Sequence, residues 1–348
     1  MLDFIETLST NKLPYIIAEI GANHNGDMEL ARKLIIAAKE AGADAVKFQS
    51  WTKNSIFIKE KYKENFFLKD DYRNRSDETL ESIIEKYSVS EQQLLEMKLF
   101  ADKVCIDFSS TPFSNQEIDF LADTLKVKFI KVASMDLNNY PFLEYIAKKN
   151  LPIILSTGLS ELYEIDKAIR TIENSGNNKI VILHCVSIYP PNDIDVNLNN
   201  IDTLAKLYPY PIGFSDHTLG SLIPLAAVVK GVKIIEKHFT LDKNLPGWDH
   251  KVSATPKELE EIVVGAKRII NALGSNRIKS VESNEQKIEF RRSVVAARKI
   301  YKGEVIEKED IVFKRPGRGL PPEAAEYIIG KSAKRTIEED TIIVRDDF

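Results

Sequence analysis

The stretch Gly213-Phe214-Ser215-Asp216-His217 is followed, after an apolar segment at 219–229, by Ile234-Ile235-Glu236-Lys237-His238-Phe239. Each of these two runs has a strand-like composition and leads directly into a histidine, and the segment between them is typical of a helix. Residues just past the strands of a parallel barrel share one rim. The sequence therefore predicts that His217 and His238 meet at a barrel mouth, where two imidazoles can bind one divalent metal ion. A hydrogen-bonded structural role is the alternative for each histidine.

Short β-branched runs alternate with helical segments through residues 1–275, which predicts a parallel sheet covered by helices. We expect eight strands, at 15–20, 45–49, 107–111, 129–134, 152–157, 180–186, 211–215 and 233–239. We expect helices at 28–41, from Ser90 onward, and at 114–124, 140–149, 160–172, 198–206, 219–229 and 256–273. Eight such units match a TIM (β/α)8 barrel. A doubly wound open sheet is the alternative, but no G-x-G-x-x-G turn follows its first strand.

The chain changes character after the predicted barrel domain at 1–275. Residues 274–286 are polar and loop-like, so we expect a linker at 276–290. Short strands at 292–298 and 311–314 and a short helix at 322–328 predict a small α+β domain at 291–348. A core of this size is marginal alone, so docking on a partner would stabilise it.

The composition excludes some classes of partner. Charged residues make up 29% of the chain with a net charge of -4, so no long-range field favours nucleic acid or an anionic membrane. The sequence has no apolar run of about 18 residues and its N-terminus lacks a signal-peptide pattern, so we expect a cytoplasmic protein. Cys105 and Cys185 lie in apolar stretches without a CxxC spacing, and we interpret both as core residues.

The connection at 50–87 is much longer than the loops that usually join a strand to a helix. Its aromatic and charged residues are Trp51, Phe57, Tyr62, Phe66, Phe67, Tyr72, Arg73 and Arg75. Two interpretations remain open: a lid that folds over the mouth, or a solvated insertion packed on the outside of the barrel.

Hydrophilic residues end the predicted strands, on the face where barrel enzymes build their active sites. They are Glu19, Lys47, Gln49, Thr111, Lys131, Ser134, Ser156, Tyr189, Ser215, His217 and His238. A lysine within an apolar strand must pair or bind an anion, because an unpaired buried ammonium is heavily penalised. With Glu19 as the only obvious inward carboxylate, Lys47 and Lys131 favour a cradle for phosphate and carboxylate groups. The alternatives are an ion pair between Lys47 and Glu19, and a Schiff-base role for Lys131.

The end of the first strand, Glu19-Ile20-Gly21-Ala22-Asn23-His24-Asn25-Gly26, is a second dense polar segment. Glu19 can act as acid or base. His24 is either a third metal ligand or a residue that orients its loop. We interpret His184, in an apolar strand, as a core histidine, and His250 as a loop residue.

Segments in the same order along nearly the whole chain resemble the sialic acid synthase family. They are 17–26, Val46-Lys47-Phe48-Gln49, Ser110-Thr111-Pro112-Phe113, Lys131-Val132-Ala133-Ser134, Ser156-Thr157-Gly158, Ser215-Asp216-His217-Thr218, Glu236-Lys237-His238-Phe239 and Lys314-Arg315-Pro316-Gly317. The resemblance implies a TIM barrel followed by an antifreeze-like (SAF, β-clip) domain in a domain-swapped homodimer. It also implies the condensation of phosphoenolpyruvate with an N-acylated aldohexose and water, which gives a nine-carbon 2-keto-3-deoxy acid and phosphate.

The resemblance also implies roles for single residues. For proton transfer it implies Glu19 and Asp136, and for a divalent ion, manganese or alternatively magnesium or cobalt, it implies His217 and His238. The residues implied to bind phosphoenolpyruvate are Lys47, Thr111, Lys131, Ser134, Ser156, Ser187 and Ser215. Those implied to contact the sugar are Gln49, Tyr189, Asp249 and Arg315 of the partner subunit.

Three departures from the family pattern fall around the expected sugar pocket. Asp136 stands where a glutamate is common, Ser187 where an asparagine is common, and Trp248 where a proline is usual. The resemblance therefore indicates the reaction class more firmly than the hexose. The segments 239–244 and 291–293 look slightly closer to legionaminic-type synthases than to the N-acetylneuraminate members.

Three other functions remain as alternatives. Lys131 is compatible with an aldolase that forms an imine. Synthases that use phosphoenolpyruvate with phosphorylated aldoses share the barrel and its chemistry, but they do not explain Arg315 and the appended domain. The small domain alone suggests an ice- or glycan-binding module, which does not need the lysines and histidines of the mouth.

Overall fold

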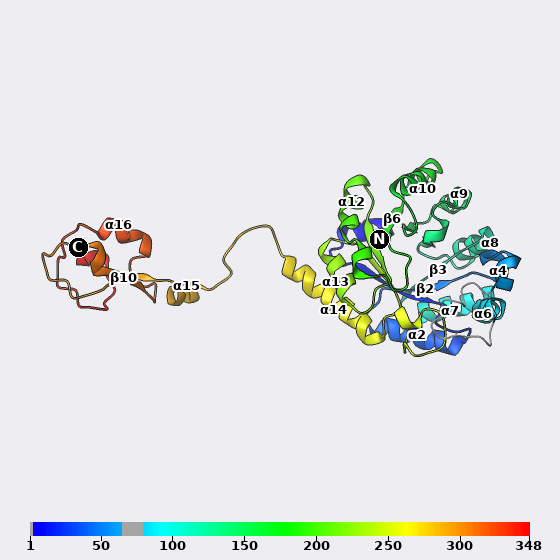
Figure 1. Cartoon of the computed structure of the whole chain (residues 1–348), viewed down its shortest axis with the longest axis horizontal. Coiled ribbons are helices and arrows are strands. Elements are labelled where there is room, and N and C mark those ends of the chain that lie inside the picture. The colour runs from blue at the N-terminus through cyan, green and yellow to red at the C-terminus, as the bar shows by residue number, and fades with distance from the viewer. Residues whose placement is uncertain (1–2, 65–78) are drawn as a thin grey trace. The chain divides into compact units, whose positions relative to one another are not determined.

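The computed structural model describes residues 3–64 and 79–348, and it divides into two compact units, Met1–Gly274 and Ser275–Phe348. Figure 1 labels the helices and strands of both units. No helix in the described part of the chain is both long enough and apolar enough to cross a membrane.

Eight parallel strands form the centre of the larger unit, as predicted. They are β1 (Tyr15–Gly21), β2 (Ala45–Gln49), β3 (Asp107–Thr111), β4 (Ile130–Val132), β5 (Ile153–Ser156), β6 (Ile180–Cys185), β7 (Ile212–Asp216) and β8 (Ile234–His238). The hydrogen-bonded order is β3-β2-β1-β8-β7-β6-β5-β4. β3 and β4 lie side by side and Ser109 Oγ donates to Phe129 O at 2.7 Å, so the sheet curls into a barrel. The predicted TIM barrel is confirmed and the open-sheet alternative is wrong.

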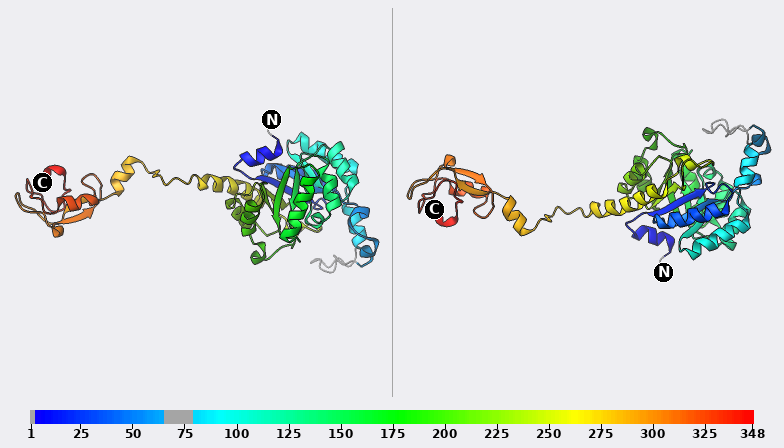
Figure 2. Two further views of the ribbon diagram at one scale, coloured as in Figure 1. Left: turned by 90° about the horizontal axis from the view of Figure 1, so that it is seen from above. Right: turned by 90° about the horizontal axis from the view of Figure 1, so that it is seen from below.

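Helices surround the strands (Figures 1 and 2). They are α2 (Met28–Glu40), α7 (Glu91–Lys103), α8 (Asn115–Asp119), α9 (Tyr140–Ala147), α10 (Leu162–Asn174), α11 (Asp193–Val196), α12 (Asn199–Leu207), α13 (Leu222–Val229) and α14 (Pro256–Leu273). The Asp27 side chain caps α2, and Ser90 and Gln93 form a capping box on α7. The helix predicted at 114–124 begins as α8 and continues as a π-helical turn, Phe120–Thr124.

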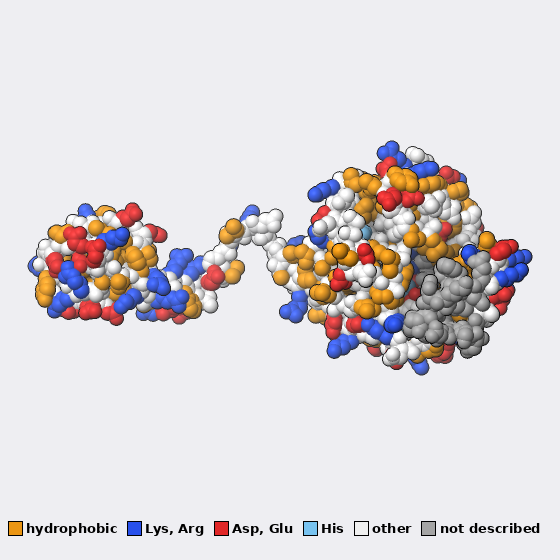
Figure 3. All heavy atoms as spheres, in the orientation of Figure 1, with side chains coloured by type: hydrophobic (Ala, Val, Ile, Leu, Met, Phe, Trp, Pro, Cys, Tyr) orange, Lys and Arg blue, Asp and Glu red, His pale blue; other side chains and the backbone are white. Residues whose placement is uncertain are grey.

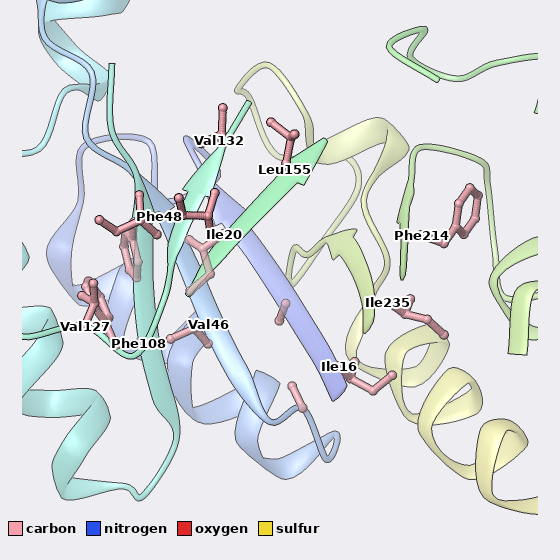
Figure 4. Packing of buried hydrophobic residues seen from close by; sticks show 14 of the residues in the cluster. Ile16, Ile20, Val46, Phe48, Phe108, Val127, Val132, Leu155, Phe214 and Ile235 are labelled. Carbon is pink, nitrogen blue, oxygen red and sulfur yellow. The ribbon is translucent and has the colours of Figure 1, made fainter. Parts of the chain in front are cut away.

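Side chains alternate between the two faces of each strand, as the period of two requires. Outward-facing residues such as Ile16, Ile20, Val46 and Phe48 pack in the main hydrophobic core (Figure 4). A smaller apolar cluster contains Leu8, Ile17, Ala45, Phe129, Ile154, Val181, Leu183 and Ile234. Leu8 of this cluster belongs to α1 (Phe4–Thr10), a helix that precedes β1 and was not predicted.

The segment at 50–87 contributes α3 (Lys53–Ile56), α4 (Lys59–Glu64) and α6 (Leu80–Tyr87). Its apolar side chains form a cluster of their own, called here the insertion cluster. The cluster consists of Ala22, Trp51, Tyr62, Leu80, Ile83, Ile84 and Tyr87, with Ile56, Phe57, Phe113 and Trp248 packed against them. The predicted lid residues Phe66, Phe67, Tyr72, Arg73 and Arg75 lie outside the described residues. Closure of this segment over the mouth stays a prediction.

The smaller unit has its own core. β9 (Ser293–Ala296) and β10 (Ile311–Lys314) pair antiparallel, and α16 (Ala325–Ile328) follows the 3-10 turn Pro322–Ala324. The part of the chain predicted to be a linker contains α15 (Asn284–Phe290), whose Ile288 carbonyl accepts a hydrogen bond from Gly317 N at 2.7 Å. Positive and negative side chains are interspersed on the visible surface of this unit (Figure 3).

Candidate active site at the barrel mouth

A cavity of about 940 Å³ lies among the carboxyl-terminal ends of the barrel strands, within the usual size of a small-molecule site. Thirteen of the fifteen predicted site residues line it. They are Glu19, Lys47, Gln49, Thr111, Lys131, Ser134, Ser156, Ser187, Tyr189, Ser215, His217, His238 and Asp249. The structure therefore brings together side chains that are up to 230 residues apart, from Glu19 to Asp249.

The strand period places these groups at two levels. Along β8, Ile234 belongs to the inner apolar cluster and Glu236 and His238 follow it at two-residue intervals. The neighbouring strands are in register, with Glu19 opposite both Lys47 and His238. Because inward positions recur every second residue, a polar floor lies above the apolar cluster and the histidines lie above the floor.

Two lysines and two carboxylates form the buried floor. Lys47 pairs with Glu19, donates to Thr111 Oγ1 at 2.7 Å and lies 3.8 Å from Glu236. Lys131 Nζ lies 3.6 Å from Glu236 Oε1. Glu236 is a second inward carboxylate, so the premise that Glu19 is the only one is wrong. Its position two residues before His238, on the same face of a strand, was the signal that could have identified it.

Burial and the neighbouring lysines shift the pKa values of the two floor carboxyl groups in opposite directions. Burial raises the pKa of Glu19 to about 7, although Lys47 lowers it. Burial would raise the pKa of Glu236 as well, but the charges of Lys131 and Lys47 outweigh burial and hold it below its ordinary value. Near neutral pH the floor therefore has one fully ionised carboxylate and one that is partly protonated, which leaves positive charge for an anion.

The ion pair between Lys47 and Glu19, the structural alternative, is present. It does not satisfy the whole site, because Ser156 Oγ is buried and has no hydrogen-bond partner among the described residues. Burial lowers the pKa of Lys131. Within the described part of the chain, its ammonium donates one hydrogen bond, to the Val132 carbonyl oxygen at 3.1 Å, and it also faces Glu236. A ligand with anionic oxygens would supply the missing acceptors.

The rings of His217 and His238 lie 5.5 Å apart, centroid to centroid. His217 Nδ1 lies 2.8 Å from the carbonyl oxygen of Val186, which identifies this nitrogen as the N–H donor and leaves Nε2 for a ligand. His238 Nδ1 is buried without a hydrogen bond among residues 3–64 and 79–348, and Asp249 Oδ2 is 3.7 Å away. This donor set fits a divalent cation.

Burial holds the pKa of His238 well below its ordinary value, and the charge of His217 lowers it further. The His238 imidazole is therefore in the neutral form that binds metals. Across the described residues, no group of three or more His, Cys, Asp and Glu side chains is arranged to hold a metal ion. An ion held by His217 and His238 would therefore keep coordination positions for water or substrate oxygens, as catalytic sites do.

Cys185 is buried, as its interpretation as a core residue predicts, and it also lines the cavity. Its Sγ lies 4.0 Å from His217 Nδ1 and accepts a hydrogen bond from Ser134 Oγ at 3.5 Å. Burial raises the pKa of Cys185, but His217 outweighs this effect and brings it to about 7. Cys105, in contrast, is exposed, so its interpretation as a core residue is wrong.

The other histidines act within the scaffold. His24 Nδ1 accepts a hydrogen bond from Gly26 N at 3.0 Å, and His24 does not line the cavity, which agrees with a loop-orienting role. His184 Nε2 lies 2.6 Å from Val196 O and the ring stacks on Phe214, so it is a core histidine as predicted. His250 lies in the connection between β8 and α14, in the 3-10 turn His250–Val252, which agrees with a loop position, and its side chain is fully buried.

Two predicted site residues do not line the cavity. Asp136 lies in the 3-10 helix Ser134–Asp136 after β4, and its carboxylate accepts from Asn139 Nδ2 at 3.3 Å. Burial raises the pKa of Asp136, but its catalytic role stays a prediction. Arg315 is an exposed residue of the smaller unit, where its guanidinium lies 5.2 Å from the centre of the Phe290 ring.

Two family models match the chain, the NeuB family over residues 34–278 and the SAF domain over residues 291–348. The N,N'-diacetyllegionaminic acid synthase of Legionella pneumophila is 40% identical over 95% of this chain and 93% of its own length. The N-acetylneuraminate-9-phosphate synthase of Homo sapiens is 35% identical over 95% of this chain and 92% of its own length.

A solved structure shows the same architecture. The N-acetylneuraminic acid synthetase of Leptospira borgpetersenii, crystallised with citrate, aligns with a TM-score of 0.68 and 35% sequence identity. The alignment covers 80% of this chain and 91% of that one. The fold and both domain types therefore agree between sequence, structure and relatives.

Proposed function

The chain belongs to the NeuB family and ends in a SAF domain, and from this premise we propose that it is a nonulosonic acid synthase. In the proposed reaction, phosphoenolpyruvate condenses with an N-acylated aldohexose and water to give a nine-carbon 2-keto-3-deoxy acid and phosphate. The acceptor is either similar to N-acetylmannosamine or a 2,4-diacetamido-2,4,6-trideoxyhexose. The names of the relatives support the product class, and the cavity supports the chemistry.

One observation carries the proposal: two buried lysines of the floor and a pair of histidines line the same cavity. Phosphoenolpyruvate carries a carboxylate and a phosphate ester, both attached to C2. These two anionic groups require two separate sets of hydrogen-bond donors. Lys47 and Lys131 supply the charge. The hydroxyl donors beside them are Thr111, Ser134, Ser156, Ser187 and Ser215.

Bond formation begins at C3 of phosphoenolpyruvate, whose enol electron pair attacks the aldehyde carbon of the sugar. C2 becomes electron-deficient, and water adds to it with loss of a proton. The resulting tetrahedral centre expels phosphate by breaking the C2–O bond, the new C2 hydroxyl gives its proton to the departing phosphate, and C2 becomes the new ketone. The buried floor holds both anionic groups while the charge redistributes, and its fixed donors need no reorganisation.

Glu19 is suited to the proton transfers. The pKa of this carboxyl is about 7, so near neutral pH it can accept a proton from the attacking water and return one to the new alkoxide. Gln49 Nε2 donates to Glu19 Oε1 at 3.1 Å and holds the carboxylate in place. Glu236 keeps a depressed pKa and stays ionised as a counter-charge to Lys131.

His217 and His238 would hold a divalent ion, with manganese as the first candidate. Such an ion supplies Lewis acidity toward an aldehyde oxygen. The residues of the chain do the positioning: the Val186 carbonyl fixes the tautomer of His217, and the Tyr189 ring packs 4.0 Å from the His217 ring. Asp249 and Tyr189 then face the sugar from the same side of the cavity as the histidines.

The proposal includes a domain-swapped homodimer in which the SAF domain of one chain supplies Arg315 to the sugar site of its partner. The support is the exposed position of Arg315 and its place within residues 291–348, which match the SAF domain. A mixed dimer tests this contribution. One chain would carry Arg315→Ala and the other Lys131→Met, and a swapped arrangement predicts that one of its two sites has both residues intact.

An aldolase that forms an imine at Lys131 is the second candidate, because burial lowers the pKa of this amine. Two experiments separate the candidates. Phosphoenolpyruvate labelled with 18O in the bridging oxygen should release all the label in phosphate if the C2–O bond breaks. Borohydride reduction in the presence of substrate should leave Lys131 unmodified, whereas a reduced adduct on Lys131 would support the aldolase.

A further inference from the structure

The loop between β8 and α14 forms part of the cavity wall. The residues of this loop that line the cavity are Trp248, Asp249, Lys251 and Val252. His250, in the middle of this run, does not line the cavity, and its side chain is fully buried. Because His250 directly follows Asp249 and begins the next turn of the chain, the placement of its ring constrains the position of the Asp249 carboxylate.

Both ring nitrogens of His250 have hydrogen-bond partners. Nδ1 lies 2.7 Å from Thr240 Oγ1, and Nε2 lies 3.2 Å from Asn25 Oδ1. An amide oxygen only accepts, so His250 Nε2–H is the donor to Asn25. The ring is therefore held from two sides, by its own loop and by the loop that follows β1.

The backbone around this contact is adapted to it. Asn25 has a left-handed φ of +53°, and its N–H donates to the carbonyl oxygen of Ala22 at 2.9 Å. Gly247 has φ +150°, and a Cβ at this position would come within 2.5 Å of Asn25 Oδ1 and of the His250 ring. The close approach of the two loops therefore requires glycine at 247.

A second set of hydrogen bonds joins the same two loops. Asn23 is fully buried, and its Nδ2 donates to Phe239 O and to Ser253 Oγ, both at 2.8 Å. Ser253 Oγ in turn donates to the carbonyl oxygen of Asp249 at 2.6 Å. The main chain at Asp249 is therefore tied to the loop after β1 twice, at Asp249 itself and at the residue that follows it.

We propose that Asn25, His250 and Ser253 are positioning residues for the acceptor sugar, which act by holding the Asp249 carboxylate in place beside His238. This inference rests on the proposed function, in which Asp249 faces the sugar. Asp249 Oδ2 lies 3.7 Å from His238 Nδ1, on the cavity side of the loop. A carboxylate that binds sugar hydroxyls must be held within about 0.5 Å of the productive geometry. The three positioning residues do not line the cavity, so they act through Asp249.

Asn25→Gly removes the acceptor of the His250 bond, while glycine keeps the left-handed backbone without strain. The KM for the acceptor sugar should rise by about tenfold to a hundredfold, because small displacements of a positioned group have effects of this size. The KM for phosphoenolpyruvate should stay within about twofold of the wild-type value. The acceptor probes are N-acetylmannosamine and 2,4-diacetamido-2,4,6-trideoxymannose, and the comparison uses whichever the wild type condenses faster.

Three further variants separate positioning from general stability. Asn25→Asp keeps an oxygen acceptor for His250 and tolerates the left-handed backbone, so its KM for the sugar should be close to the wild-type value. Ser253→Ala breaks the second tie and should raise the same KM, which keeps the test open if Asn25→Gly does not fold. Asn150→Gly changes another left-handed asparagine, with φ +55°, away from the cavity, and it should leave both KM values unchanged.

A double-mutant cycle tests whether Asn25 acts through Asp249. Asp249→Ala alone should raise the KM for the sugar. Because the carboxylate is then absent, adding Asn25→Gly should raise this KM by less than about twofold more.

The outcomes separate this inference from the proposed function. An unchanged KM for the sugar in folded Asn25→Gly or Ser253→Ala would overturn the inference, and so would equal rises in the KM values of both substrates. Effects of Asn25→Gly and Asp249→Ala that multiply in the double variant would overturn it as well. In all these cases condensation by the wild type leaves the synthase intact. Failure of the wild type to condense either sugar with phosphoenolpyruvate would overturn the proposed function together with the inference.

Discussion

Asp216 on β7 and Lys237 on β8 form an ion pair that is fully buried directly behind the two histidines. The two residues are register partners, and each precedes a cavity histidine, His217 or His238, by one position. Lys237 also donates to the Thr218 carbonyl at 2.7 Å, and Asp216 accepts from Thr218 N at 2.9 Å. These bonds tie the ends of the two strands together and fix the spacing of the histidines.

Lys237→Met should lower the free energy of unfolding by about 3–5 kcal/mol, because it leaves the Asp216 carboxylate buried without its counter-ion. Chemical denaturation measures this loss. The double variant Lys237→Met with Asp216→Leu should recover a large part of it. Arg170→Ala, which removes an exposed ion pair with Asp166, should change stability by no more than the error of the measurement. A loss below about 1 kcal/mol in Lys237→Met would contradict the structural role of the pair.

Removal of either His217 or His238 should abolish tight binding of divalent ions while the barrel stays folded. The reason is that His217 and His238 are the two imidazoles that line the cavity among the residues the structure describes. Isothermal titration of the metal-free protein with manganese, after treatment with a chelator, measures the change. His184→Gln, which alters a buried histidine outside the cavity, controls for loss of packing and should bind manganese as the wild type does. Unchanged affinity in His217→Ala or His238→Ala would show that the ion binds elsewhere.

Lys131→Met should lower the affinity of the protein for phosphoenolpyruvate by about tenfold to a hundredfold, since a hydrogen bond to a charged group contributes about 1.5–3 kcal/mol. The same loss is expected for Lys47→Met, because both ammonium groups belong to the buried floor of the cavity. Calorimetric titration with phosphoenolpyruvate gives both affinities. Lys128→Met alters an exposed lysine that pairs with Asp107 away from this cavity, and it should bind phosphoenolpyruvate normally. If Lys131→Met and Lys47→Met bound phosphoenolpyruvate as tightly as Lys128→Met does, phosphoenolpyruvate would bind somewhere other than the floor.

The activity should depend on pH through Glu19. In the folded protein the pKa of this carboxyl is about 7, raised from 4.5 by burial, and the ionised form is the one that accepts a proton from water. The value of kcat/KM should therefore rise as pH increases through 7 and reach a plateau above it. Glu19→Gln should remove this limb of the profile along with most of the turnover. A profile that falls as pH rises through 7 would instead assign Glu19 as the acid.

The same raised pKa has a consequence for stability. Between pH 4.5 and about 7, the folded protein retains a proton on Glu19 that the unfolded chain has released. Stability contributed by this group is therefore present at low pH and decreases as pH rises through this interval. Denaturation midpoints of the wild type and Glu19→Gln should diverge in this range, with the variant less dependent on pH.

The alternation of strands and helices and the polar residues at strand ends were enough to predict the barrel and most of its mouth. Glu236 was missed because Glu236-Lys237-His238 are all polar, so the alternation of polar and apolar residues does not show which of them face inward. The partners of His250 and Cys185 could not be identified from local pattern, since residues such as Asn25 and His217 lie far along the chain from them. The helix α1 was missed because a short capped helix at a terminus gives a weak periodic signal.

The central claim is that phosphoenolpyruvate, rather than pyruvate, is the carbon nucleophile. The most direct measurement incubates the protein with manganese, an acylamino hexose and either phosphoenolpyruvate or pyruvate, and follows phosphate release and product mass together. The account predicts a nine-carbon keto acid formed in a one-to-one ratio with phosphate from phosphoenolpyruvate alone. The same acid formed from pyruvate, or no acid from phosphoenolpyruvate with any acylamino hexose, would contradict it.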